Sequence, residues 1–365
     1  MAPALARRSA EEPSQRRNIR LMIVDDSMVA RAVLSRMVEV GGGIEISAVA
    51  GTAEDAVEAL AHVSVDVILL DLEMPGAGGL SKLPEIIAAA RGARVLVCSS
   101  LAEEGAAATV RALAQGAADT LLKPGTGRLQ GRFADILTAK IRALGPLERD
   151  AVRSRSASSA APLRAMGVED LSLLAIGAST GGIHSLGRFF ADLPRKIGVP
   201  ILVTQHLPVP FMDVFARQLS SAAYRPARIA TEGAPLVPDE VLIAPGDAHL
   251  TVEGGRSGAL RVRLLRGRAA SGCLPSVDPM LASIAALDLP GAVAVILSGM
   301  GRDGVDGAGH LVAAGGAVLV QDEATSAVWG MPRAVADAGL AAAILPPEKL
   351  ARRVASRIGQ FHANQ

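Results

Sequence analysis

The sequence predicts two α/β domains, each a doubly wound parallel sheet with helices on both faces. Three observations lead to this prediction. The chain has 365 residues, which is long for one compact domain. Half of the residues are apolar but only 2% are aromatic, so alanine, valine and leucine must fill the cores. Short aliphatic runs alternate with longer segments of helical period in two blocks, which is typical of parallel strands joined by helices.

The first block, residues 19–144, contains four strand-like runs that end in polar residues. These runs are RLMIVDD (20–26), VDVILLDLEMP (65–75), ARVLVCSS (93–100) and ADTLLKP (118–124). Between them, residues 28–40, 53–63 and 107–116 carry apolar side chains three and four positions apart, which predicts helices. The block therefore predicts one βαβα domain.

The composition changes after this block. Residues 145–170 are rich in Ser, Arg, Ala and Pro and have no clear period, which predicts a linker. A second α/β domain is expected over residues 171–365, and residues 1–18 are expected to be a disordered tail. The strand-like runs of this second domain are LSLLAIGAS (171–179), IGVPILVTQH (197–206), VLIAPGD (241–247), AVAVILSGM (292–300) and GGAVLVQDEA (315–324).

Charge and cysteine content argue against several classes of protein. Lys and Arg number 37 against 36 acidic residues, so nothing global favours binding to nucleic acid. The two cysteines, Cys98 and Cys273, fit a reducing compartment and are expected to be packing residues. No apolar run reaches the roughly 18 residues of a membrane span, and the N-terminal residues lack the apolar segment of a signal peptide. The sequence thus predicts a cytoplasmic protein without membrane insertion.

Polar residues close several strands of the first domain: Asp25 and Asp26, Asp71, Ser99 and Lys123. Ligands collect at the carboxyl ends of the strands in a doubly wound sheet, so these side chains are expected to share a pocket. Clustered carboxylates require a cation, and Mg²⁺ suits oxygen ligands. An Asp oxygen beside this ion and a Lys can attack a phosphoryl group. Each acid alone would be interpreted as a solvated strand end, but together they predict a phosphoryl-transfer site.

This first domain resembles the receiver domain of bacterial response regulators. The resemblance rests on VDDS, LLDLEMP, the Ser of VCSS and the KP pair, in the family's order and spacing over residues 19 to about 140. It implies a flavodoxin-like fold and phosphorylation of Asp71 by a histidine kinase. The other implied site residues are Asp25, Asp26 and the Glu73 carbonyl, which with Asp71 would hold Mg²⁺, and Ser99 and Lys123, which would contact the phosphoryl group.

The stretch LLAIGASTGGIHS contains a GxSxG motif, Gly177 to Gly181, directly after an aliphatic run. Glycines on both sides allow a sharp, strained strand-to-helix turn that exposes the Ser179 hydroxyl, and the amides of the turn could hold an oxyanion. By itself the motif is equally consistent with a tight turn. A dinucleotide site is less favoured, because Ser replaces the second glycine and no acid follows about twenty residues later.

A nucleophilic serine needs a base, and the base needs an orienting acid. His206 ends the strand-like run at 197–206, and Asp303 follows the run at 292–300. All three candidates therefore fall at carboxyl ends of strands. The order Ser, His, Asp differs from the Ser, Asp, His order of α/β-hydrolases and disfavours a generic lipase or esterase. The remaining histidines, in less suitable contexts, are His62, His184, His249, His310 and His362.

The second domain resembles the catalytic domain of protein-glutamate methylesterases of the CheB family. The matching segments are IGASTGG, VTQHLP, LIAPGDAHL, PSVDPM, LSGMGRDG and QDEATSAVWGMP, which cover most of residues 172–340. The resemblance implies a Rossmann-like serine-hydrolase fold with Ser179 as nucleophile, His206 as base and Asp303 as orienting acid. Thr180 and Met300 would line the site, with the Met300 amide as a candidate oxyanion donor.

Two residues depart from this family's pattern. Leu207 stands where methionine is common and is expected to affect packing only. His184 stands where an acidic residue is often found, close enough to the Ser179 turn to affect the site.

Together the two resemblances imply a phosphorylation-activated protein-glutamate methylesterase. Its substrates would be glutamate γ-methyl esters on chemoreceptor cytoplasmic domains, and its phosphodonor a chemotaxis histidine kinase. Deamidation of receptor glutamines is the implied second activity. Hydrolysis would need no cofactor, whereas receiver phosphorylation would need Mg²⁺. In the family, the unphosphorylated receiver covers the catalytic cleft.

Two alternatives remain at this point. The first is a phosphorylation-gated signalling or binding module whose hydrolase-like domain is inactive. The second is a free-standing metabolic esterase, which does not account for the receiver.

Overall fold

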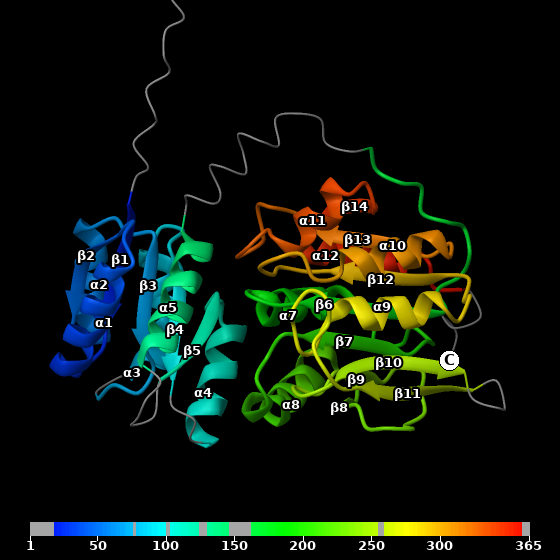
Figure 1. Ribbon diagram of the computed structural model, residues 1–365, viewed down its shortest axis with the longest axis horizontal. Helices are drawn as coiled ribbons and strands as arrows, with labels where there is room; N and C mark the ends of the chain where they lie inside the picture. The colour runs from blue at the N-terminus through cyan, green and yellow to red at the C-terminus, as the bar shows by residue number, and fades with distance from the viewer. Residues whose placement is uncertain are drawn as a thin grey trace, which may run out of the picture.

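The structure is a computed structural model that describes residues 18–75, 78–99, 103–123, 130–145, 162–254 and 259–359. Two α/β units lie side by side (Figure 1). The predicted tail at 1–17 and residues 146–161 of the predicted linker lie outside the described residues. The end of the predicted linker runs against the second unit, where the Arg164 amide donates to the Ala341 carbonyl at 2.9 Å.

The first unit is a five-stranded sheet in the order β2-β1-β3-β4-β5, and all of its strand pairs are parallel. This order places a topological switch point between β1 and β3, where flavodoxin-like sheets bind their ligands. Asp71 ends β3, and Asp25 directly follows β1 at that point. The elements are β1 (Ile19–Val24), α1 (Met28–Val40), β2 (Ile44–Ala50), α2 (Ala53–His62), β3 (Val67–Asp71), α3 (Gly78–Ala89), β4 (Arg94–Ser99), α4 (Glu103–Ala114), β5 (Asp119–Leu122) and α5 (Gln130–Leu144).

Local sequence accounts for where the first two helices begin. The Ser27 hydroxyl accepts from the Ala30 amide at 3.2 Å and caps α1, and the Thr52 hydroxyl accepts from the Asp55 amide at 3.1 Å and caps α2. The all-aliphatic run that precedes Asp71 is buried on both faces, as expected for a central parallel strand.

The second unit is a seven-stranded sheet in the order β14-β13-β12-β6-β7-β9-β8, again with parallel pairs only. The sequence order reverses at β6, which pairs with β7 on one side and β12 on the other. The elements are β6 (Leu173–Ala178), α7 (Gly182–Asp192), β7 (Ile201–Gln205), η1 (Val209–Phe211), α8 (Met212–Ala223), β8 (Ala227–Ile229), β9 (Val241–Ile243), β10 (His249–Gly254), β11 (Leu260–Leu265), α9 (Val277–Ala285), β12 (Ala292–Ile296), α10 (Val305–Ala313), β13 (Ala317–Gln321), α11 (Met331–Asp337), β14 (Ala341–Leu345) and α12 (Pro347–Ala355).

An antiparallel hairpin, β10–β11, was not predicted from the sequence. Its inward residues Leu250, Val252 and Val262 are buried. The amide of Val252 donates to the Ser283 hydroxyl of α9 at 3.1 Å, so the hairpin is joined to the helix that follows it. The hairpin leads into the segment before α9, which contributes to the candidate site described below.

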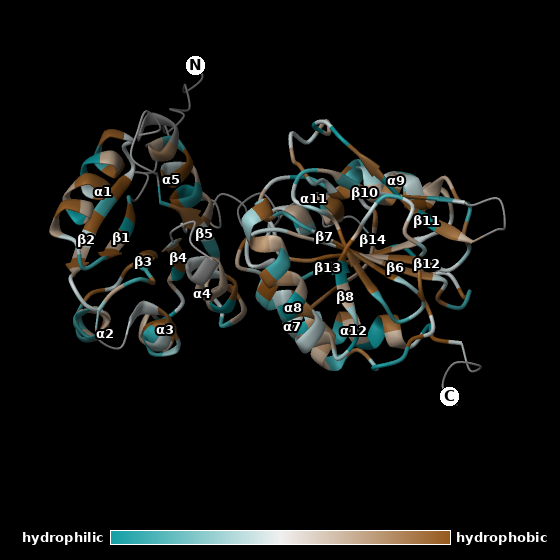
Figure 2. Cartoon of the chain, turned by 90° about the horizontal axis from the view of Figure 1, so that it is seen from below, coloured by the Kyte–Doolittle hydropathy of each residue, from teal (hydrophilic) through white to brown (hydrophobic). Residues whose placement is uncertain are grey.

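The strands of both sheets are mostly apolar and lie inside the helix layers (Figure 2). In the second unit, aromatic side chains of α7, η1 and α8 supply the bulk on one face of the sheet. Phe189 and Phe190 of α7 are fully buried and stack edge to face, with ring centroids 5.6 Å apart. No described helix is both long and apolar enough to span a bilayer.

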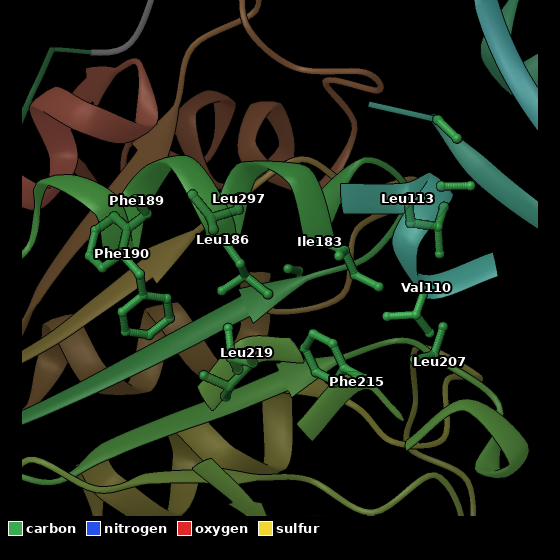
Figure 3. Packing of buried hydrophobic residues seen from close by; sticks show 14 of the residues in the cluster. Val110, Leu113, Ile183, Leu186, Phe189, Phe190, Leu207, Phe215, Leu219 and Leu297 are labelled. Carbon is green, nitrogen blue, oxygen red and sulfur yellow. The ribbon is translucent and has the colours of Figure 1, made fainter. Parts of the chain in front are cut away.

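The two units share an apolar contact (Figure 3). Val110 and Leu113 of α4 lie opposite Ile183 of α7 and Leu207 of the loop after β7, and all four belong to one buried cluster. A polar contact lies beyond this cluster, where the Arg94 guanidinium donates to the Ser326 carbonyl at 2.9 Å. The first unit therefore packs directly against the edge of the second sheet at which β6 and β7 end.

Candidate active site

Ser179 lies in the turn between β6 and α7, above the centre of the second sheet. The turn depends on Gly181, which has a φ of +76°. A Cβ there would lie 2.4 Å from the Ala327 Cβ, so both conformation and space require glycine. The left-handed conformation of this turn is at Gly181, while Ser179 is not among the described residues with positive φ.

The loop after β12 closes over this turn. The Ser179 amide donates to the Ser298 carbonyl at 3.0 Å. A Cβ on Gly299 would lie 2.9 Å from the Ser179 Cβ and 2.3 Å from the Met331 sulfur. Glycine in the GMG segment therefore allows the β12 loop to approach the serine closely.

His206 and Asp303 form a hydrogen-bonded pair at the same edge of the sheet. The His206 Nε2 and Asp303 Oδ2 are 2.7 Å apart. The Asp303 side chain is 1% exposed and the His206 side chain 17%. The His206 amide also donates to the Ala178 carbonyl at 3.0 Å, which holds its backbone beside the Ser179 turn. Ser179, His206 and Asp303, each of which follows a different strand, thus lie around one site.

The electrostatics of this pair favour charge separation. Burial opposes the imidazolium, but the hydrogen bond to Asp303 and the neighbouring Cys273 outweigh it and raise the pKa of His206 from 6.5 to about 9. Burial by itself would raise the pKa of the Asp303 carboxyl. The hydrogen bond to His206 and two further donors outweigh burial and hold this pKa well below its usual range. Because the folded state raises the pKa of His206, protonation of this histidine stabilises the fold. This contribution to the free energy of unfolding is fully present below pH 6.5 and is lost as the pH rises through about 9.

The nitrogen that faces Asp303 is Nε2, which leaves Nδ1 of His206 as the atom able to take a proton from a nucleophile. Within the described part of the chain, no hydrogen bond joins the Ser179 hydroxyl to His206. The more familiar arrangement directs Nδ1 to the acid and Nε2 to the serine. Here the roles of the two nitrogens are exchanged.

Backbone amides near Ser179 are available as anion donors. The amides of Thr180 and Met300 bond no other described residue. The amide of Gly181 is occupied, because it donates to the Ala118 carbonyl of the first unit at 2.6 Å. The predicted use of the Met300 amide as an oxyanion donor stays a prediction.

The first unit also reaches the site through a side chain. Asp119, at the start of β5, accepts from the Thr180 hydroxyl at 2.7 Å and from Lys140 Nζ of α5 at 2.6 Å, both through Oδ2. Sequence analysis missed Asp119, which appeared only as part of a strand-like run. A cavity of about 250 Å³ lies between the units, and Ser179, His206 and Asp119 contribute to its lining.

The two departures from the family pattern both lie at this contact. The Nδ1 of His184 donates to the Ala114 carbonyl of α4 at 3.0 Å. Leu207 is buried in the apolar cluster shared by the two units, in agreement with the packing role expected of it.

The two cysteines have different surroundings. Cys98 is buried as expected, and burial raises its pKa to about 12. Cys273 is half-buried and was expected only to pack, but its sulfur lies within 4.8 Å of ligand atoms of His206 and Asp303. These three residue types can bind zinc. However, three donors already engage the two carboxylate oxygens of Asp303, so we interpret the group as a hydrogen-bonded site.

The acidic residues of the first unit gather as the sequence predicts. Carboxylate oxygens of Asp25, Asp26 and Asp71 lie within 4.8 Å of one another. Lys123 Nζ lies 2.6 Å from Asp71 Oδ2 and 3.7 Å from Asp25 Oδ2. The Ser99 hydroxyl is fully buried and bonds no described residue. This orphaned donor and the lysine both suit a phosphoryl group on Asp71.

The same cluster fits a divalent cation. Burial raises the pKa of Asp25 above its ordinary value, and the nearby Asp71 carboxylate adds to the rise. A cation would relieve this repulsion. The Glu73 amide donates to Asp71 Oδ1 at 3.0 Å, while the predicted use of its carbonyl as a ligand stays a prediction.

The electrostatics of the His206–Asp303 pair can be tested by NMR. We expect the imidazole of His206 to titrate well above pH 6.5, near pH 9. Asp303→Asn removes the carboxylate charge, so the midpoint should fall. Titration of ¹⁵N-labelled histidine measures both values. Asp213→Asn changes an exposed carboxyl on α8 and serves as the matched control. An unchanged midpoint in Asp303→Asn would contradict the assignment.

The chain is similar to several known proteins along most of its length. A family model described as CheB methylesterase matches residues 174–354, and one described as response regulator receiver domain matches residues 21–132. A Caulobacter vibrioides protein named protein-glutamate methylesterase/protein-glutamine glutaminase 2 is 42% identical, over 93% of this chain and 99% of its own. A Rhodopseudomonas palustris protein, named protein-glutamate methylesterase/protein-glutamine glutaminase of group 2 operon, is 38% identical over 97% of this chain and 98% of its own.

A crystal structure of the Thermotoga maritima CheB methylesterase catalytic domain is 34% identical, covers 51% of this chain and 98% of its own, and gives a TM-score of 0.49. Near-complete coverage of relatives at 42% and 38% identity decides the assignment. On this evidence the chain belongs to the CheB family of methylesterases, with a receiver domain in front of the methylesterase domain.

Proposed function

We propose that this chain is a phosphorylation-regulated protein-glutamate methylesterase and protein-glutamine glutaminase. It acts on the cytoplasmic domains of chemoreceptors. The observation that supports this most directly is the bonded pair of His206 and Asp303 beside Ser179, in a chain that matches its named relatives almost end to end. The second unit is the methylesterase domain of residues 171–365, and the first is the receiver domain of residues 19–144.

In the first half of the reaction, the Ser179 oxygen attacks the side-chain carbonyl of a glutamate γ-methyl ester. His206 takes the serine proton on Nδ1, because Asp303 holds Nε2. The amides of Thr180 and Met300 are the free donors for the negative oxygen of the tetrahedral intermediate. The intermediate then collapses, with transfer of the proton from His206 to the leaving methanol.

Water completes the reaction by attacking the acyl-serine, with His206 again as base, and releases free glutamate. A glutamine side chain presents the same carbonyl with an amide leaving group. That group must be protonated to depart, and the His206 imidazole, which has taken the serine proton, can supply the proton. Both reactions use the same residues.

The intact pair argues against the inactive-module alternative. A hydrolase-like domain without activity would have no need of a buried carboxylate that two further donors hold against the imidazole of His206. The packing of a receiver against the site also argues against a free-standing metabolic esterase.

In the receiver, Asp71 accepts a phosphoryl group from a chemotaxis histidine kinase. Asp25, Asp26, Asp71 and the Glu73 carbonyl would hold Mg²⁺, which supplies charge neutralisation at the transferring oxygens. Lys123 pairs with the phosphoryl oxygen, and the buried Ser99 hydroxyl gains the acceptor that it lacks in this structure.

The receiver regulates the esterase by covering the serine turn. The Ala118 carbonyl accepts a hydrogen bond from the Gly181 amide, and the Asp119 carboxylate accepts one from the Thr180 hydroxyl. Both bonds lie directly beside Ser179. A receptor helix cannot reach the serine while these contacts hold. Phosphorylation shifts the population toward an undocked receiver.

Ser179→Ala tests the nucleophile. Methanol release from methylated receptor should fall at least about a thousandfold, because the attacking oxygen is removed. Gas chromatography of released methanol measures the rate. The control is Ser356→Ala, which changes an exposed serine at the C-terminal end of α12 and should keep full activity. Wild-type methanol release by Ser179→Ala would refute the assignment.

Asp71→Asn tests the phosphorylation site. A small phosphodonor with Mg²⁺ should label the wild-type chain, and the variant should incorporate no acyl phosphate because the attacking oxygen is gone. The control is Asp55→Asn, an exposed acid of α2. Undiminished labelling of Asp71→Asn would show that another residue is the acceptor.

Asp119→Ala tests the docked contact. The variant loses the bonds to Thr180 and Lys140, so methanol release without phosphodonor should rise about tenfold, toward the phosphorylated rate. Asp55→Ala should leave the basal rate unchanged, and labelling of Asp71 shows that the variant receiver is folded. A basal rate equal to that of the wild type would argue against this contact as an inhibitory one.

A further inference from the structure

The carboxylate of Asp303 has two donors besides His206, and both come from the segment that begins α9. The Ser276 hydroxyl donates to Oδ1 at 2.5 Å, and the Val277 amide donates to Oδ2 at 2.7 Å. Ser276 is 0% exposed and Asp303 is 2% exposed, so water cannot replace either donor. The segment lies in the PSVDPM stretch, between His206 and Asp303 in the sequence.

Ser276 is itself held by a histidine that the sequence analysis set aside. The Ser276 amide donates to Nδ1 of His249 at 2.9 Å. His249 begins β10 and is buried. Its Nδ1 must therefore be the unprotonated nitrogen. The unexpected β10–β11 hairpin thus fixes the backbone from which the Ser276 hydroxyl reaches Asp303.

The division of donors between the two carboxylate oxygens matters for catalysis. A buried carboxylate can rotate about its Cβ–Cγ bond unless both oxygens are engaged. With Oδ1 bonded to Ser276, Oδ2 is directed to His206 Nε2. The imidazole is then oriented with Nδ1 free for the proton of Ser179. Without the hydroxyl, Oδ1 would be a buried acceptor with no partner and the carboxylate would turn to find one.

We infer that Ser276 is a positioning residue for the proposed esterase reaction: its hydroxyl locks the Asp303 carboxylate in the rotation that orients His206. Ser276 does not touch the substrate and acts only through Asp303. It also caps α9, since its oxygen accepts from the Asp278 amide at 3.3 Å. This inference rests on the proposed function and adds one member to its machinery.

Three substitutions separate positioning from capping. Ser276→Ala removes the hydroxyl and the cap. Ser276→Gly removes the hydroxyl but keeps a favourable residue at the helix start. Ser276→Thr keeps both. We expect kcat for methanol release by the phosphodonor-treated full chain to fall about ten- to hundredfold in the first two variants, with KM little changed. Ser276→Thr should retain most of the wild-type kcat.

The titration of His206 gives a readout that needs no catalysis. Loss of alignment with Asp303 should lower the NMR midpoint of His206 in Ser276→Ala and Ser276→Gly but not in Ser276→Thr. The other titratable residues near the site, Cys273, Asp278 and His249, are present in all three variants. Ser220→Ala removes a half-buried hydroxyl of α8 that bonds only the Arg225 carbonyl, and serves as the control.

Wild-type kcat and a wild-type His206 midpoint in Ser276→Gly would overturn the inference, because capping alone would then explain the residue. A failure of the proposed function is distinguishable from this result. It would appear as methanol release in Ser179→Ala, whereas the His206 midpoint would still respond to Ser276.

Discussion

The site depends on the parallel pairing of β6 with a neighbour on each side. Gly177 of β6 lies in register with Thr204 of β7 and with Ile296 of β12. This register brings the ends of three strands to one level, so the turns that follow them carry Ser179, His206 and Asp303 to a common point. Because the sheet reverses its order at β6, helices on the two sides diverge there and leave room above the serine. A slip of one residue in either pairing would turn these side chains to the other face of the sheet.

Much of this arrangement could be predicted from the sequence. Aliphatic runs that end in polar residues mark buried parallel strands, and the carboxyl ends of such strands must share an edge, so the gathering of polar residues around Asp71 and around Ser179 could be predicted. Ser276, His249 and Asp119 could not. The residues that they bond lie in other segments of the fold. A serine at a helix start, a histidine at a strand start and an aspartate in a receiver strand are common residues at such positions and do not by themselves indicate a site. The β10–β11 hairpin was missed because short strands of mixed charge resemble loops.

The contact between the domains is specific but limited. It combines two apolar contacts, one around Leu113 and Ile183 and one where Val328 packs into the core of the first unit, with a few hydrogen bonds to backbone carbonyls and one carboxylate. Polar contacts of this kind contribute modest net free energy, because undocking returns the same groups to water. A small change in the receiver can therefore shift the population of docked molecules, which suits a regulated enzyme.

One consequence follows from the Asp119–Thr180 bond. The bonds that hold the receiver on the serine turn lie directly beside Ser179, so under the proposed function docking of the receiver and binding of a substrate exclude each other. Thermodynamic linkage makes such exclusion reciprocal. Under the proposed function, a substrate that occupies the esterase site would therefore draw molecules out of the docked state, and the position of the receiver would depend on the abundance of substrate.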